Sequence, residues 1–250
     1  MDYKGAQPPE AITASSVEQF KRYQEAAKGW IKYITLSPEH DPNYALTHYC
    51  IGNGVAVSMG HSSAGYDGAM LGIANGATCM THVYNGMTPL HHRNPGLVGA
   101  ALRVSDIYGE IIADGQHSHP AALQIFFAAK GKDHAITVTD SLRAKHCPPG
   151  GNYQLGGHDI EIGEDGLARL KGTTTIAGST LRMNEGLRIL IEVAGVPVEA
   201  AINSCTINPA RCIGVGHRKG RICAGYDADL VVLEADYAVA QTYCRGKAFR

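Results

Sequence analysis

The feature that most constrains the fold of this chain is a regular alternation between short apolar runs and longer segments with helical periodicity. The short runs are rich in β-branched residues, as buried strands are, and they cover residues 31–36, 55–59, 77–81, 107–112 and 135–139. The other segments predict helices over residues 16–28, 42–52, 66–75 and 119–130. This alternation predicts strand-helix units that build a parallel sheet, and therefore an α/β protein.

The pattern changes after the fifth predicted strand. Residues 152–170 alternate apolar and polar positions around the turn signals Gly156-Gly157 and Asp165-Gly166, which predicts an inserted β-hairpin or meander. Helical periodicity returns in residues 180–195 and in residues 198–214. We expect these two helices to close the wall of a barrel, and the tail, with two apolar runs between tight turns, to form strands of a small β-structure.

Composition excludes several classes of protein. With 44% apolar and 18% charged residues the chain is globular, and its formal net charge of −1 argues against a nucleic-acid partner. No stretch approaches the roughly 18 to 20 apolar residues that cross a bilayer, and the first residues lack a basic segment followed by an apolar run. The seven cysteines include no C-x-x-C pair, so we expect scattered thiols in a cytoplasmic protein with no membrane partner.

Each predicted strand is followed by a polar side chain suited to chemistry. These strand-end residues are Glu39, His61, His82, Asp114 with His117, and Asp140. Because the active site of a βα-barrel is built at the carboxyl ends of its strands, we expect several of them to converge. A lone strand-end histidine is more often structural than a metal ligand, but two on neighbouring strands together with Asp140 favour a metal site.

The segments around these residues resemble a known family. In order along the chain they read KGAQPPEAI, TLSPE, MGHSSA, MTHVYNGM, RNPGLVGAAL, IIADGQHSHP, VTDS, IAGSTLRMNEGLR, NPARCIG and AGYDADLVVL. In this order they are similar to the motifs of N-acetylglucosamine-6-phosphate deacetylases of the amidohydrolase superfamily. The last segment is shared by many amidohydrolases, whereas THVYN, RNPGL and ADGQH together point to the deacetylases.

The resemblance implies a fold and a domain division. The fold is a partial TIM-like (β/α) barrel of the amidohydrolase type, with about five of the eight strands of a closed barrel, and a remnant of a small β-sandwich domain. The hydrolase domain would cover residues 1–215, with a β-hairpin insertion near residues 150–171. Residues 216–250 would be the C-terminal strands of the small β-domain.

The resemblance also implies a reaction, the hydrolysis of N-acetyl-D-glucosamine 6-phosphate to D-glucosamine 6-phosphate and acetate in amino-sugar catabolism. His61 and His82 match the two histidine ligands of a divalent metal ion (Zn, Fe, Co or Mn), which would polarise the amide carbonyl and lower the pKa of bound water. Asp140 matches the catalytic acid/base, which takes a proton from the attacking water and returns it to the departing amine. The plainer alternative is that Asp140 only caps a helix.

Further positions match residues that bind the sugar phosphate in the family: Ala6, Asn85, Gly86, Arg93, His117, Ile176, Ala177 and Gly178. A guanidinium can hold phosphate oxygens bidentately, and the backbone of the Asn85-Gly86 turn can add donors. The family pattern implies a homodimer in which Arg93 reaches the neighbouring subunit's site. Alternatively, Arg93 is a solvated loop charge.

The sequence departs from the family near its start. The family's third metal ligand is a glutamate in an E-G-P motif just before the segment matching KGAQPPE, and the sequence contains no E-G-P. The first three barrel strands also have no counterpart, so the resemblance is to an N-terminally truncated member. Because a catalytic metal usually has three protein ligands, we expect weak or absent deacetylase activity from this chain alone. Smaller departures are Gly86 and Ser141, where the family usually has alanine.

Two other functions stay open from the sequence. One is a different amidohydrolase such as a cyclic amidase, which would require a carboxylated lysine or a richer set of histidines at the strand ends, and the sequence shows no lysine there. The other is a non-catalytic fragment that binds sugar phosphate or a partner chain through open sheet edges.

Overall fold

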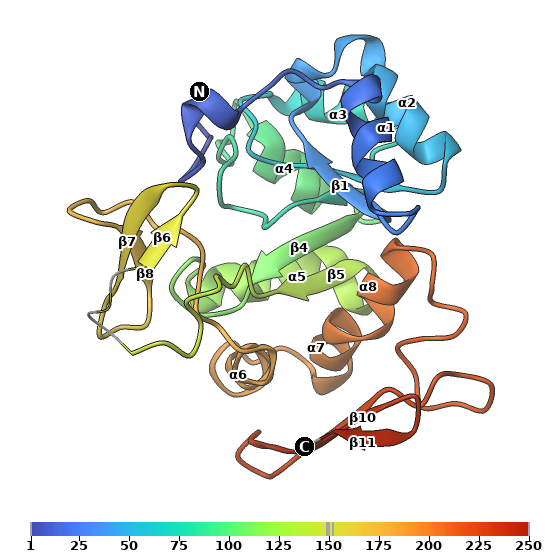
Figure 1. Ribbon diagram of the computed structural model, residues 1–250, viewed down its shortest axis with the longest axis vertical. Helices are drawn as coiled ribbons and strands as arrows, with labels where there is room; N and C mark the ends of the chain where they lie inside the picture. Colours follow the sequence, from blue (N-terminus) through green and yellow to red (C-terminus); the bar gives the residue numbers. More distant parts are fainter. Residues whose placement is uncertain (1, 149–150, 152, 250) are drawn as a thin grey trace.

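The computed structural model describes residues 2–148, 151 and 153–249 of the chain (Figure 1). Its centre is a five-stranded parallel sheet in which each strand pairs with the next along the chain. The strands are β1 (Tyr33–Leu36), β2 (Ala56–Met59), β3 (Cys79–Met80), β4 (Tyr108–Ile112) and β5 (Ala135–Val138). The predicted α/β class and all five strands are confirmed, and each strand is shorter than the run that predicted it.

Helices connect the strands and continue the chain after the sheet (Figure 1). They are α1 (Val17–Ala26), α2 (Ala45–Gly52), α3 (Tyr66–Ala74), α4 (Gly96–Arg103), α5 (Pro120–His134), α6 (Met183–Arg188), α7 (Val198–Cys205) and α8 (Ile207–Cys212). Short 3₁₀ turns cover Pro9–Ala11, Pro38–His40 and Pro42–Tyr44, and a π-helical turn over Ile189–Val193 extends α6. The Ser16 hydroxyl accepts the Gln19 amide hydrogen at 3.2 Å and so caps the start of α1.

Two helices differ from the sequence prediction. No helix was predicted over α4, which begins at Gly96 directly after Pro95 and has no side-chain cap at its start. The single helix expected over residues 198–214 is broken at Thr206, where φ is −132° and ψ is −87°. Pro209 then lies in the first turn of α8, where its missing N–H costs no helical hydrogen bond.

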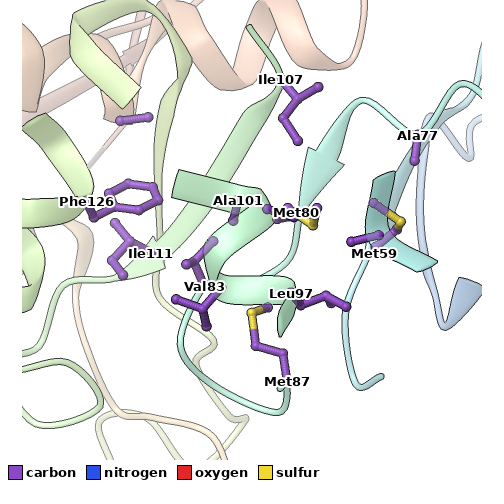
Figure 2. Packing of buried hydrophobic residues seen from close by; sticks show 14 of the residues in the cluster. Met59, Ala77, Met80, Val83, Met87, Leu97, Ala101, Ile107, Ile111 and Phe126 are labelled. Carbon is purple, nitrogen blue, oxygen red and sulfur yellow. The ribbon is translucent and has the colours of Figure 1, made fainter. Parts of the chain in front are cut away.

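The two faces of the parallel sheet have opposite chemistry. One face packs its apolar side chains against the helices, and Figure 2 shows Met59 and Met80 of the strands on the side of Leu97 of α4, with Ile111 beside Phe126 of α5. On the other face Oγ1 of Thr81 lies 2.8 Å from Oγ1 of Thr35 and 2.6 Å from the hydroxyl of Ser58. Strand alternation thus leaves a polar surface on the side away from the core.

The insertion after β5 is the antiparallel meander that the sequence predicted. Its strands are β6 (Tyr153–Leu155), β7 (His158–Ile162) and β8 (Ala168–Leu170). The turn from β6 to β7 has positive φ at both Gly156 (56°) and Gly157 (86°), a conformation that glycine adopts without steric cost. The meander has its own small core, which includes Ile160 and Ala177.

The C-terminal residues form a separate three-stranded sheet, seen at the bottom of Figure 1. Its strands β9 (Leu230–Leu233), β10 (Val239–Cys244) and β11 (Lys247–Phe249) are antiparallel, one strand more than the two apolar runs suggested. Within the described ranges, the helices are all too short or too polar to pass through a bilayer.

Candidate functional site

Three of the predicted site residues stand two positions after the end of a strand, and each has a left-handed backbone. φ is 48° at His61 after β2, 28° at His82 after β3, and 49° at Asp140 after β5. For a residue with a side chain this conformation costs about 1–3 kcal/mol and persists only where neighbouring contacts hold it. All three side chains line one cavity of about 470 Å³, together with Thr35 and Thr81 of the polar face.

The two histidines meet ring to ring. Their Nε2 atoms are 3.0 Å apart, and the ring planes cross at 83°. Nδ1 of His61 lies 2.8 Å from the carbonyl oxygen of Tyr3, which can only accept, so Nδ1 carries the proton. In neutral His61 the lone pair therefore sits on Nε2 and faces His82.

His82 is the more buried partner, with 7% of its surface exposed. Burial lowers the pKa of His82, the nearby His61 lowers it further, and the carboxylate of Asp140 opposes the shift. Its Nδ1 is buried without a hydrogen-bond partner in the described part of the chain. The lowered pKa favours the neutral imidazole, which is the form that binds metal ions.

The two histidines could serve as two of the ligands of a divalent metal ion. Converging imidazole nitrogens suit Zn²⁺, Fe²⁺, Co²⁺ or Mn²⁺, and the unpartnered Nδ1 of His82 is free to carry the proton while Nε2 binds. No cluster of three or more His, Cys, Asp or Glu side chains in metal-binding arrangement occurs in residues 2–148, 151 and 153–249. The described residues thus provide two ligands beside the carboxylate of Asp140.

The turn after His82 brings Asn85 and Gly86 to the same place. The Asn85 amide donates to the carbonyl of His82 at 3.0 Å, and the Ser62 amide donates to the carbonyl of Gly86 at 3.1 Å. φ of Gly86 is 57°, and an added Cβ would stand 3.0 Å from Nδ1 of His61. These two residues therefore adjoin the histidine pair.

The segment of Ile176, Ala177 and Gly178 runs beside Asp140. The Ser179 amide donates to the carbonyl of Asp140 at 2.8 Å, and a Cβ on Gly178 would lie 3.0 Å from that oxygen. Ala177 is fully buried in the meander core, against which Ala6 also packs.

Arg93 and His117, like the other predicted substrate-binding residues, do not line this cavity. Arg93 is exposed, and its amide donates to Nδ1 of His91 at 3.3 Å. His117 follows β4, and its Nδ1 lies 2.5 Å from a carboxylate oxygen of Asp114. Burial acts to raise the pKa of Asp114, but the hydrogen bonds donated by His117 and the amide of Gln116 outweigh it and hold the pKa below its usual range.

Two carboxylates near the histidines had no role in the sequence prediction. Glu39, noted only as a strand-end residue, accepts hydrogen bonds from Ser62 and Ser63, directly after His61. Glu110 of β4 accepts the His82 amide hydrogen at 3.4 Å. Burial raises the pKa of Glu110, the hydroxyl of Tyr33 and the His82 amide lower it, and Asp140 adds to the rise. Their positions next to the histidines depend on how the strands pair, and local sequence motifs do not encode that pairing.

Comparisons with known proteins show the family and the fold type of the chain. The model of the amidohydrolase family matches residues 8–249. An N-acetylglucosamine-6-phosphate deacetylase of Bacillus subtilis (strain 168) is 43% identical over 97% of this chain and 60% of its own length, and one of Danio rerio is 38% identical over 98% and 61%. A solved mutant N-acetyl-D-glucosamine-6-phosphate deacetylase of Mycobacterium smegmatis, in complex with N-acetyl-D-glucosamine-6-phosphate, superimposes with a TM-score of 0.92 at 33% identity, covering 98% of this chain and 65% of that one.

These matches confirm the resemblance drawn from the motifs and the amidohydrolase type of the fold. The chain spans about 60% of the length of the curated relatives it matches.

Proposed function

Because the chain belongs to the amidohydrolase family, we propose that its site hydrolyses N-acetyl-D-glucosamine 6-phosphate to D-glucosamine 6-phosphate and acetate. The observation that carries the proposal is the meeting of His61, His82 and Asp140 in one cavity, two imidazoles beside one carboxylate. The deacetylases among the relatives support this choice of substrate.

His61 and His82 would hold a divalent ion through their Nε2 atoms. When bound, such an ion polarises the amide carbonyl and lowers the pKa of a bound water. Asp140 takes the proton of the attacking water and delivers it to the nitrogen of the amine as the C–N bond breaks. Thr35 and Thr81 add two hydroxyl groups to the lining of this cavity.

The substrate would lie between the turn of Asn85 and Gly86 and the segment of Ile176, Ala177 and Gly178, with Ala6 at its edge. Small residues on both sides support this arrangement, because they let a sugar approach the backbone closely. His117, together with Arg93 of a second subunit, would bind the phosphate group of the substrate. Exposure of Arg93 supports the action in trans, and hence a homodimer.

The hydrolase domain would be residues 1–215, and residues 216–250 would belong to a small β-domain. A cytoplasmic location is supported by the seven cysteines, which are all free.

The test is acetate release from N-acetyl-D-glucosamine 6-phosphate by the 250-residue chain with one equivalent of Zn²⁺, Fe²⁺, Co²⁺ or Mn²⁺. Because the described residues supply only two histidine ligands, we expect weak turnover that depends on the added ion and is lost in a His61→Ala, His82→Ala double variant. The unphosphorylated sugar is the matched control for the phosphate. Binding of the sugar phosphate with neither metal uptake nor acetate release would contradict the proposal and favour a non-catalytic binding protein.

A further inference from the structure

Both oxygens of the Glu39 carboxylate accept hydrogen bonds from the loop that carries His61. One oxygen accepts the hydroxyl hydrogen of Ser62 at 2.6 Å, and the other accepts the amide of Ser63 at 2.6 Å and its hydroxyl at 3.0 Å. Glu39 belongs to the 3₁₀ turn Pro38–His40 after β1, whereas both serines follow β2. The bonds therefore tie the ends of two neighbouring strands together next to His61.

His61 itself is held at two further points. The Ser37 hydroxyl donates to the carbonyl oxygen of His61 at 2.7 Å, and Nδ1 of His61 donates to the carbonyl of Tyr3 at 2.8 Å. The tyrosine contact fixes the ring, while Ser37 and Glu39 fix the backbone before and after it. A left-handed residue needs such support, because an unsupported loop relaxes to extended or right-handed backbone and turns the side chain elsewhere.

Glu39 does not have the geometry of a ligand or a proton carrier. Three donated hydrogen bonds occupy both of its oxygens, and they hold the pKa of Glu39 below its usual range although burial acts to raise it. A carboxylate held in this way accepts hydrogen bonds and orients the groups that donate them.

Asp41, two residues further on, provides an internal comparison. Its buried carboxylate accepts the amides of Leu46 and Thr47, each at 2.9 Å, and the Thr47 hydroxyl at 2.7 Å. The chemistry is the same, three donated hydrogen bonds, but the donors belong to the first turn of α2. Asp41 thus stabilises a helix, and Glu39 stabilises the loop of His61.

We propose that Glu39 is a positioning residue, which holds His61 in the left-handed conformation that directs its Nε2 at Nε2 of His82. The inference deepens the proposed function and rests on it, because the affinity of the histidine pair for a divalent ion is its main readout. Glu39 acts through Ser62 and Ser63 and does not touch the ion or the substrate.

The test compares Glu39→Gln with Asp41→Asn and the unaltered chain. Zn²⁺ affinity is measured by competition with a chromophoric chelator, and stability by urea unfolding. Glu39→Gln loses the charge and keeps one acceptor, so we expect Zn²⁺ to bind about 10- to 100-fold more weakly. Asp41→Asn is expected to lower the free energy of unfolding and to leave the affinity of the folded protein for Zn²⁺ unchanged. Equal Zn²⁺ affinity in Glu39→Gln and the unaltered chain would overturn the inference, as would an equal loss in both variants.

A second readout separates this inference from the proposed function. Long-range ¹H–¹⁵N spectra of the metal-free protein report which ring nitrogen of His61 is protonated. We expect the Nδ1–H form in the unaltered chain and a mixture in Glu39→Gln. If the unaltered chain binds no Zn²⁺, the metal proposal fails, and an unchanged His61 spectrum in Glu39→Gln overturns the role of Glu39 independently. Ser63→Ala, which removes one of the three bonds, provides a milder variant if Glu39→Gln does not fold.

Discussion

Gly86 leaves room for the ring of His61: a Cβ atom built on Gly86 would lie 3.0 Å from Nδ1 of the histidine and 3.2 Å from its Cε1. Gly86 also has a φ of 57°, which a residue with a side chain adopts only at a cost. We therefore predict that Gly86→Ala lowers the free energy of unfolding by about 1–3 kcal/mol, measured by urea unfolding. The ring of His61 must also shift by a few tenths of an ångström to admit the Cβ, and the Zn²⁺ affinity of the variant measures whether the histidine pair tolerates that shift.

Gly54→Ala is the matched control for this prediction. Gly54 also has positive φ, 69°, but an added Cβ meets nothing within 4 Å. It should show the backbone cost alone, with unchanged affinity for Zn²⁺. Equal destabilisation and equal Zn²⁺ affinity in the two variants would contradict a specific contact with His61.

Protonation of His82 gives a pH dependence whose sign is fixed by its burial. Because burial lowers its pKa in the folded state below the ordinary 6.5, the unfolded chain binds a proton first as the pH falls. The metal-free protein should therefore lose stability below about pH 6.5, by up to about 1.4 kcal/mol per pH unit from this residue. In His82→Gln the urea-unfolding free energy should fall less steeply over the same range, and an identical slope would refute the assignment.

Asp114 is expected to stabilise the loop after β4 through His117. Its pKa in the folded state lies below the ordinary 3.8, so its contribution is present above that pH and is lost as the pH falls through the lower folded value. Asp114→Asn should lower the free energy of unfolding near neutral pH by about 1–3 kcal/mol. It should also weaken binding of N-acetyl-D-glucosamine 6-phosphate if His117 contacts the phosphate. The loss of stability should disappear in strong acid, and a difference that is constant with pH would contradict this origin.

Lys130 of α5 is a buried cation whose charge opposes folding. Its Nζ donates to the carbonyl of Val104 at 2.6 Å and to that of Ile107 at 2.9 Å, and burial lowers its pKa from 10.5 to about 8. The unfolded chain therefore binds more protons between these values, and stability should rise with pH in this window. Relative to Lys130→Met, the unaltered chain should gain about 1–3 kcal/mol from pH 8 to 10.5 in urea unfolding. Lys132→Met, on the exposed side of the same helix, should keep this gain.

Periodicity and strand-end logic accounted for much of the fold and for part of the site. The five strands follow from β-branched runs, and the convergence of His61, His82 and Asp140 follows from parallel strands that end at one edge. Helix α4 was not predicted by that reasoning, because it begins at a glycine, Gly96, and no side chain caps its start. Nor were the left-handed backbones, since nothing in the residue types His and Asp demands positive φ.

The hydrogen-bond partners that lie on neighbouring strands could not be predicted from the sequence either. The three bonds of Glu39 join loops that are more than twenty residues apart, and Asp41 makes similar bonds to a helix only a few residues away. Sequence composition around these two carboxylates does not distinguish their targets, because the register of β1 against β2 decides which loop each one meets. Arg93 illustrates the same limit, because its predicted role depends on a second subunit.

Asp140→Asn tests the proton transfer at the centre of the proposed reaction. The amide has nearly the shape of the carboxylate but cannot take a proton from water or return it to the amine, so acetate release should fall by about 10²- to 10⁴-fold. Binding of N-acetyl-D-glucosamine 6-phosphate, measured by calorimetry, should persist in the variant, because the side chain acts on the reacting atoms. Ser141→Ala is the neighbouring control: its hydroxyl donates to the carbonyl of Leu181 at 2.6 Å, away from the histidines, and it should keep the unaltered rate. If Asp140→Asn released acetate as fast as Ser141→Ala, the carboxylate of Asp140 would not be the acid and base of the reaction.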